Sequence, residues 1–182
     1  MENNDDNSDF YLKPIFAYSS FFISKNGLFS QMLTFEYKEE SGNYMYKIET
    51  DDNFYQNEIN NIWNNMQFFM DQTNTYVNDK NVFPKVVDVE IEFKDEYTPL
   101  FYWIINFKTE LNKGFNIYKS EFEKEILDYD AISIYILEPP LKIKRIESSM
   151  KFEINEDKNI IKYYGFKGDF IGPEEIIEFI NE

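Results

Sequence analysis

Residues 86–108 carry the best candidates for chemistry in this chain. Asp88, Glu90 and Glu92 alternate with apolar residues, so on a β-strand their side chains would share one face. Such a row can ligate a cation through oxygen atoms or supply a general acid and base, but it more often forms a solvated sheet face. Acidic and aromatic residues continue into the next turn and strand. The candidate partner-binding residues are Asp88, Glu90, Glu92, Asp95, Glu96, Tyr97 and Tyr102.

The residue types that are missing exclude several kinds of active site. The chain has no histidine and no cysteine, so imidazole bases, thiolate nucleophiles and His- or Cys-ligated metals cannot form. Arg145 is the only arginine, which argues against bidentate clamps for phosphate or carboxylate. The glycines form no phosphate-cradling motif. We therefore expect no catalytic residues, no metal and no cofactor.

The charge balance points to the kind of partner. The formal net charge is -16, which repels phosphate backbones and anionic lipids and attracts basic proteins with salt-sensitive rates. Aromatic residues make up 19% of the chain, more than a core of this size absorbs easily, so some tyrosines should lie at interfaces. We expect a basic protein partner, no direct binding of nucleic acid and no membrane association.

The chain ends and the overall size predict location and domain organisation. The acidic amino terminus lacks the basic region of a signal peptide, and residues 14–24 are too short and too polar to span a bilayer. We predict a cytoplasmic protein. Residues 1–9 have little to bury and are expected to form a flexible acidic tail, and residues 10–182 a single α+β domain.

Strands joined by short turns predict an α+β fold with a largely antiparallel sheet built from meanders and hairpins. Residues 15–24 and 28–38 flank an Asn-Gly turn, and residues 44–49 would complete a three-stranded meander. In the strand that bears the acidic row, Val87, Val89, Ile91 and Phe93 should face the core. Four further segments are predicted as strands: residues 100–105, covered on both faces, residues 131–137, buried, and a hairpin of residues 150–154 and 160–166.

One main helix and a short C-terminal helix are expected to pack on this sheet. The main helix should span residues 54–71, because apolar residues recur there at helical spacing: Ile59, Ile62, Trp63, Met66, Phe69 and Met70. The terminal helix would begin at Pro173, since proline favours the first helical position. Residues 120–127 could form one or two further helical turns, and residues 72–81 are predicted to be a loop.

These observations lead to a small acidic cytoplasmic binding or inhibitory protein. We expect it to cover a basic partner, as an immunity protein or a mobile-element inhibitor does, with its acidic surface imitating a nucleic acid. One alternative is an assembly subunit that oligomerises through aromatic surfaces. Another is a carboxylate-only glycosidase or a carbohydrate-binding module. The sequence does not determine the oligomeric state.

Overall fold

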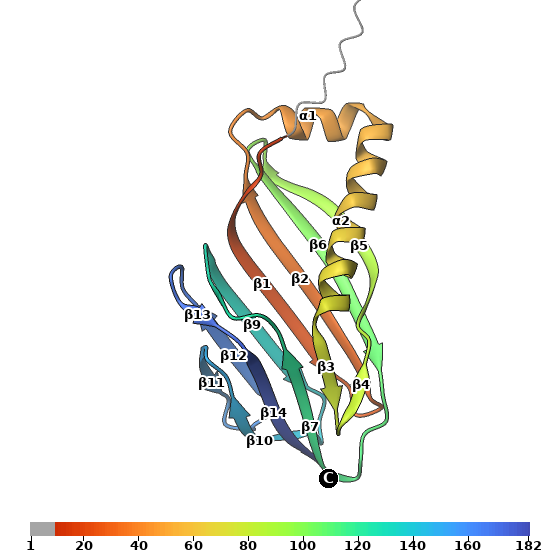
Figure 1. The fold of residues 1–182 in the computed structure, drawn as a ribbon, viewed down its shortest axis with the longest axis vertical. Helices are drawn as coiled ribbons and strands as arrows, with labels where there is room; N and C mark the ends of the chain where they lie inside the picture. The colour runs from red at the N-terminus through yellow and green to blue at the C-terminus, as the bar shows by residue number, and fades with distance from the viewer. Residues whose placement is uncertain (1–9) are drawn as a thin grey trace, which may run out of the picture.

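The computed structural model describes residues 10–182, which form an α+β fold dominated by two β-sheets (Figure 1). The larger sheet has seven strands in the order β11-β12-β9-β1-β2-β6-β5, and the smaller has five in the order β10-β14-β7-β3-β4. The predicted tail, residues 1–9, lies outside the described residues. In chain order the elements are β1 (Lys13–Ile23), β2 (Leu28–Lys38), α1 (Asn43–Thr50), α2 (Asp52–Gln72), β3 (Asn74–Val77), β4 (Lys80–Val82), β5 (Lys85–Asp95), β6 (Thr98–Lys108), β7 (Gly114–Glu121), β8 (Glu125–Ile126), β9 (Asp130–Leu137), β10 (Lys142–Glu147), β11 (Lys151–Ile154), β12 (Ile160–Gly165), β13 (Phe170–Ile171) and β14 (Glu174–Asn181).

Three predicted hairpins supply six of the seven strands of the larger sheet, and β9 is the seventh. The hairpins are β1–β2, β5–β6 and β11–β12, each paired antiparallel. The β1–β2 turn requires glycine, because Gly27 has φ 78° and a Cβ there would lie 1.8 Å from the Thr109 carbonyl oxygen. The sheet is mixed, since β1 pairs in parallel with β9.

Both hydrophobic cores lie on one face of this sheet. One core is enclosed between the seven-stranded and five-stranded sheets and includes Phe29, Leu137 and Ile177. The other lies beneath α1 and α2 and includes Tyr44 and Trp103. Figure 1 shows α2 running beside the five-stranded sheet, so together they cover the inner face. Neither helix in residues 10–182 has the length and apolar run needed to cross a bilayer.

The structure corrects the predicted third strand of the meander. Residues 44–49 belong to helix α1, and β2 pairs with β6 instead. Tyr44 and Ile48, four residues apart, are both buried, and the Tyr44 hydroxyl donates to Glu58 Oε2 of α2 at 2.9 Å. The sequence of this segment fits a helix and a strand equally well, and contact with α2 makes it a helix.

The predicted C-terminal helix is also wrong, because residues 174–181 form strand β14. This strand lies inside the five-stranded sheet between β10 and β7. Glu175, Ile177 and Phe179 alternate inward and are buried. Two other predictions fail nearby: residues 120–127 hold the end of β7 and the short β8 in place of helical turns, and residues 72–81 contain β3 and part of β4 in place of a loop.

The main helix lies where it was expected, but some of its predicted buried residues do not. The prediction of residues 54–71 corresponds to α2. Ile62 is buried, Trp63 is half-buried, and Phe69 is 55% exposed, so the two aromatic residues are not core anchors.

Two of the predicted buried strands are covered on one face only. In β6, Phe101 and Trp103 are buried while Tyr102 and Ile104 on the other face stay half-buried, and β9 likewise buries only Tyr135 and Leu137. In β5, Val87 is 47% exposed because a β-bulge between Val86 and Asp88 shifts the register there.

Candidate functional site

The acidic row lies on an edge strand and faces solvent. Asp88, Glu90 and Glu92 are exposed on β5, which is the last strand of the seven-stranded sheet. Val89 and Ile91 point to the opposite face and are buried beneath α2. Side chains two residues apart on a strand are separated by about 7 Å, so the row has a fixed spacing that only side-chain rotation can alter.

Part of the open edge of β5 is occupied by side chains. Gln67 of α2 accepts a hydrogen bond from the Val86 N–H at 2.9 Å and donates one to the Pro84 carbonyl oxygen at 3.3 Å. Farther along the strand, the Asp88 carboxylate accepts from the Val89 N–H at 3.0 Å. These contacts satisfy backbone groups that an edge strand otherwise offers to another chain. A partner that approaches the edge of β5 would therefore meet the carboxylates more than free backbone groups.

The turn after β5 holds the next three candidates. Asp95 Oδ1 accepts a hydrogen bond from the Tyr97 N–H at 2.9 Å. A hydrogen bond with Glu96, and then the negative charge of Glu96, raise the pKa of the Tyr97 hydroxyl. The Tyr97 carbonyl accepts from the Glu39 N–H at 2.9 Å, which ties the turn to the segment before α1. Tyr97 is 44% exposed, so its ring lies at the surface beside two carboxylates.

Tyr102 lies next to Glu90 on the outer face of the sheet. The register pairs Glu90 with Tyr102, Tyr102 with Thr34, Thr34 with Tyr18, and Tyr18 with Ile132. Residues in this row face away from both cores and are partly exposed. The outer face, which we define by this row and its neighbours Phe22 and Met32, is thus aromatic and aliphatic at its centre and acidic at the β5 edge.

The carboxylates of this region are not neutralised within the described chain. Among residues 10–182, none of the five candidate acids forms an ion pair, although lysines lie nearby. Lys85 pairs with Asp71 at 3.2 Å and Lys94 with Glu36 at 3.1 Å, so the two lysines of β5 are engaged elsewhere. No group of three or more carboxylates in residues 10–182 is arranged to hold a metal ion. The geometry suits contact with a positively charged surface.

A second group of polar residues lies inside the molecule, between the sheets. Glu175 of β14 is 8% exposed, and burial raises the pKa of its carboxyl from 4.5 to about 7. The nearby hydroxyls of Tyr135 and Tyr163 lower this pKa and so oppose part of the effect of burial. Within residues 10–182, the buried Tyr163 hydroxyl has no hydrogen-bond partner of good geometry. Glu175 is therefore a carboxyl that changes charge near neutral pH inside the protein.

Sequence reasoning missed Glu175 because the segment was assigned to a helix. The signal was present in the alternation of Glu175, Ile177 and Phe179, which places a carboxylate in line with two core residues. The tyrosines that meet it come from β9 and β12, and nothing local in the chain indicates those contacts.

Comparison with known proteins assigns this chain to no family. No protein-family model matches this chain, and no curated protein is similar to it in sequence. Among solved structures, a protein from Parabacteroides distasonis described as a "putative protease" aligns with 93% of this chain at 4% identity and a TM-score of 0.36. The match covers 40% of that protein, so this chain spans about two-fifths of its length. A likeness at this level carries no argument about function.

Proposed function

We propose that this protein is a binding or inhibitory protein that covers a basic protein partner with the outer face of its seven-stranded sheet. The observation that carries the proposal is the set of carboxylates at the β5 edge that form no ion pair within residues 10–182, beside an apolar face that neither core uses. An apolar centre with a charged rim is the usual composition of a protein interface.

The acidic rim and the apolar centre would have different roles in binding. Asp88, Glu90 and Glu92 would attract a basic surface and speed the encounter, because their fixed repulsion is relieved when positive charge approaches. Tyr102 and Tyr18 would then supply contact area, since tyrosine combines a large apolar ring with a polar end. The same row of negative charges allows the protein to occupy a surface that normally grips nucleic acid.

Charge reversal on β5 tests this proposal. A partner captured from the native host would be purified, and its association rate measured with the wild type and with Glu90→Lys, Glu92→Lys over a salt series. We expect the double variant to associate at least about tenfold more slowly at low salt and to lose most of the salt dependence. Its fold should be intact, because both residues are exposed.

The matched control is Glu156→Lys, Asp157→Lys, which makes the same change of net charge at the exposed turn between β11 and β12. Equal slowing by both variants would indicate a general charge effect. If the Glu90→Lys, Glu92→Lys variant keeps the wild-type association rate and salt slope, the acidic row is only a solvated sheet face and the proposal is wrong.

A second candidate function, assembly of this chain with itself, is favoured by the charge distribution of the same face. Lys151 and Lys162 lie at the opposite edge from β5, and the register places Glu153 opposite Lys162. A two-fold axis along the strands would place β5 of one copy over β11 and β12 of the other, so acids would meet lysines. The geometry would be that of two aligned, stacked sheets.

The size of the face is sufficient for such a dimer. Six inter-strand spacings of about 4.8 Å give a width of about 29 Å. The four strands β1, β2, β6 and β5 have 11 residues each, which gives a length of about 35 Å, and β9, β12 and β11 are shorter, with 8, 6 and 4 residues. A stable interface buries about 800 Å² on each partner, less than this face offers. Light scattering coupled to size-exclusion chromatography separates the two candidates. If the wild type is a dimer and Met32→Lys is a monomer, assembly through this face is supported. If the wild type is itself a monomer, assembly is ruled out and the basic partner is left as the candidate.

A further inference from the structure

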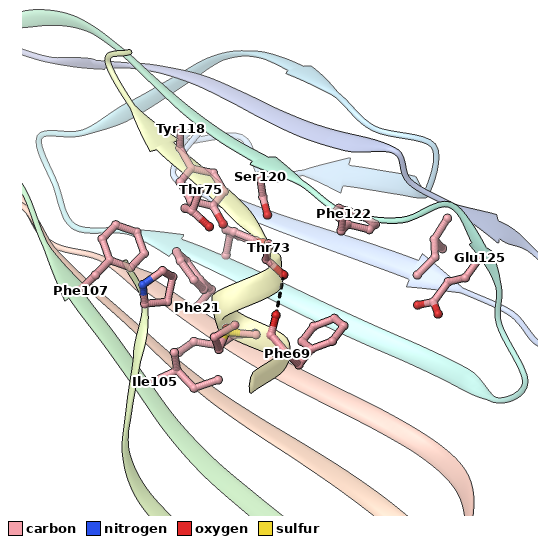
Figure 2. A pocket seen from close by; sticks show the side chains of 15 residues that line it. Phe21, Phe69, Thr73, Thr75, Ile105, Phe107, Tyr118, Ser120, Phe122 and Glu125 are labelled. Atoms are coloured by element: carbon pink, nitrogen blue, oxygen red, sulfur yellow. Dashed lines mark hydrogen bonds between the residues drawn. The ribbon is translucent and has the colours of Figure 1, made fainter. Parts of the chain in front are cut away.

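A cavity of about 230 Å³ opens between α2 and the two sheets, away from the outer face (Figure 2). Its floor is a row of paired residues on the inner face of the larger sheet: Tyr135 pairs with Phe21, Phe21 with Gln31, and Gln31 with Ile105. Three of these four side chains are apolar or aromatic. The floor is thus a flat hydrophobic surface with one amide in it.

The walls of the cavity come from segments that are distant in sequence. Tyr118, Ser120 and Phe122 line it from β7 and the residue after it, and Phe69 and Thr73 line it from the end of α2. Thr73 donates to the Phe69 carbonyl oxygen at 3.2 Å, which stabilises the last turn of the helix at the entrance. The ring of Phe69 is 55% exposed, so a molecule that enters the cavity can reach it.

Phe69 also joins this cavity to two neighbouring hollows. One, of about 280 Å³, is bordered by Phe122, Glu123 and Glu125. The other, of about 250 Å³, runs under α2 between Phe69 and Trp103. The three share Phe69 as a lining residue, and we call the first of them, which Phe21, Phe69 and Tyr118 line, the aromatic groove.

Two polar residues line the cavity at different ends. Thr75 is only 3% exposed, and its side chain lies toward the cavity (Figure 2). Glu125 lies at the other end of the group in Figure 2, and neither Glu125 nor Glu123 forms an ion pair in the described part of the chain. The groove therefore has a negative entrance and a hydroxyl group inside.

We propose that this groove binds a small organic cation with an aromatic body, whose ammonium group lies at Glu125 and whose ring lies among Phe21, Phe69 and Tyr118. A polar substituent on the far side of the ring would reach the Thr75 hydroxyl. This site is independent of the proposed function, because it lies on the inner face and uses none of the β5 acids.

The chemistry of the lining favours a cation over other small molecules. The Glu125 carboxylate at the entrance favours an ammonium group, and the aromatic side chains favour contact with an aromatic ring. The apolar body of the ligand would gain by leaving water for the floor and walls. The volume lies below the roughly 300–1,000 Å³ of drug-sized sites, so one ring with a short amine chain is the appropriate size.

A matched series of ligands tests the proposal by calorimetric titration of the whole chain. The probes are tyramine, its neutral analogue tyrosol and its anionic analogue 4-hydroxyphenylacetate. We expect tyramine to bind with a Kd below about 1 mM, tyrosol at least about fivefold more weakly, and the anion not at all. Phenethylamine, which lacks the ring hydroxyl, should bind more weakly than tyramine, and Thr75→Val should remove that difference.

Two variants separate the groove from the general negative charge of the protein. Glu125→Gln should bring the affinity for tyramine to that for tyrosol, whereas Glu156→Gln, at an exposed turn between β11 and β12, should leave it unchanged. Phe69→Ser should weaken both ligands. Equal binding of tyramine and tyrosol, equal effects of Glu125→Gln and Glu156→Gln, or no binding of tyramine at 10 times the expected Kd would each overturn the proposal.

Discussion

Glu175 on β14 lies close to the hydroxyl of Tyr135 on β9, so an acidic group of the smaller sheet meets the inner face of the larger one. The contact is buried, which penalises the charged form of the carboxyl. A group whose charge depends on pH thus lies in the interface between the two sheets.

The raised pKa of Glu175 predicts how stability changes with pH. The folded protein keeps this proton up to about pH 7, whereas the unfolded chain loses it near 4.5, so the free energy of unfolding falls as the pH rises through this range. The loss should amount to about 3 kcal/mol. Glu175→Gln should remove it, so that urea unfolding from pH 5 to 8 gives a flatter profile for the variant and a higher stability at pH 8.

The control for that experiment is Glu174→Gln, one residue earlier on β14. Glu174 points away from Tyr135 and pairs with Lys119 at 3.1 Å at the surface. Its variant should keep the wild-type pH profile. A flat profile in the wild type would mean that Glu175 titrates as an ordinary surface carboxyl.

Trp103 should matter more for stability than Trp63. Trp103 is 4% exposed, and its Nε1 donates to the Ile62 carbonyl oxygen at 3.3 Å, whereas Trp63 is only half-buried on α2. Trp103→Ala should cost about 3–5 kcal/mol and Trp63→Ala less than about 2 kcal/mol. Equilibrium unfolding in urea measures both, and a larger loss for Trp63 would contradict the packing described for α2.

Gln67 should stabilise the edge of β5 through its two backbone hydrogen bonds. Gln67→Met keeps the length of the side chain but leaves the Val86 N–H and the Pro84 carbonyl without their partner. We expect a loss of about 1–2 kcal/mol in the free energy of unfolding. Gln56→Met, at an exposed position of the same helix, is the matched control and should change stability by less than about 0.5 kcal/mol.

A comparison of two glycines distinguishes the cost of a positive φ from the cost of a steric clash. Gly27 and Gly114 both have positive φ, 78° and 87°, but only at Gly27 would a Cβ meet another atom, the Thr109 carbonyl oxygen at 1.8 Å. Gly114→Ala should cost about 1–2 kcal/mol from conformation alone. Gly27→Ala should cost clearly more, because the turn must also move away from Thr109. Thermal or urea unfolding of the two variants checks the order, and equal losses would place the Gly27 turn away from that carbonyl.

Local patterns in the sequence were enough to predict the elements that form from neighbouring residues. The Asn-Gly turn predicts the β1–β2 hairpin, and the helical spacing of Ile59 and Ile62 predicts α2. The alternation of Glu90 with Ile91 predicts which face of β5 is exposed to solvent. These signals are reliable because strand and helix periodicities differ and each was repeated over several turns or residue pairs.

Short segments with mixed periodicity were decided by tertiary contacts. Residues 174–181 satisfy a helix pattern and a strand pattern, and pairing with β7 and β10 makes them a strand. Residues 44–49 are equally ambiguous, and contact with α2 makes them a helix. Local preference is worth only tenths of a kcal/mol per residue, so pairing and burial outweigh it.

The candidate sites divide in the same way. The sequence by itself determined the acidic row on β5 and excluded histidine and cysteine chemistry, because residue identity and strand alternation are local properties. Only the tertiary structure brought Phe21, Phe69 and Tyr118 around one cavity and Glu175 beside Tyr135. Those contacts join residues about 40 to 100 positions apart, and the chain encodes them through the packing of two sheets and a helix.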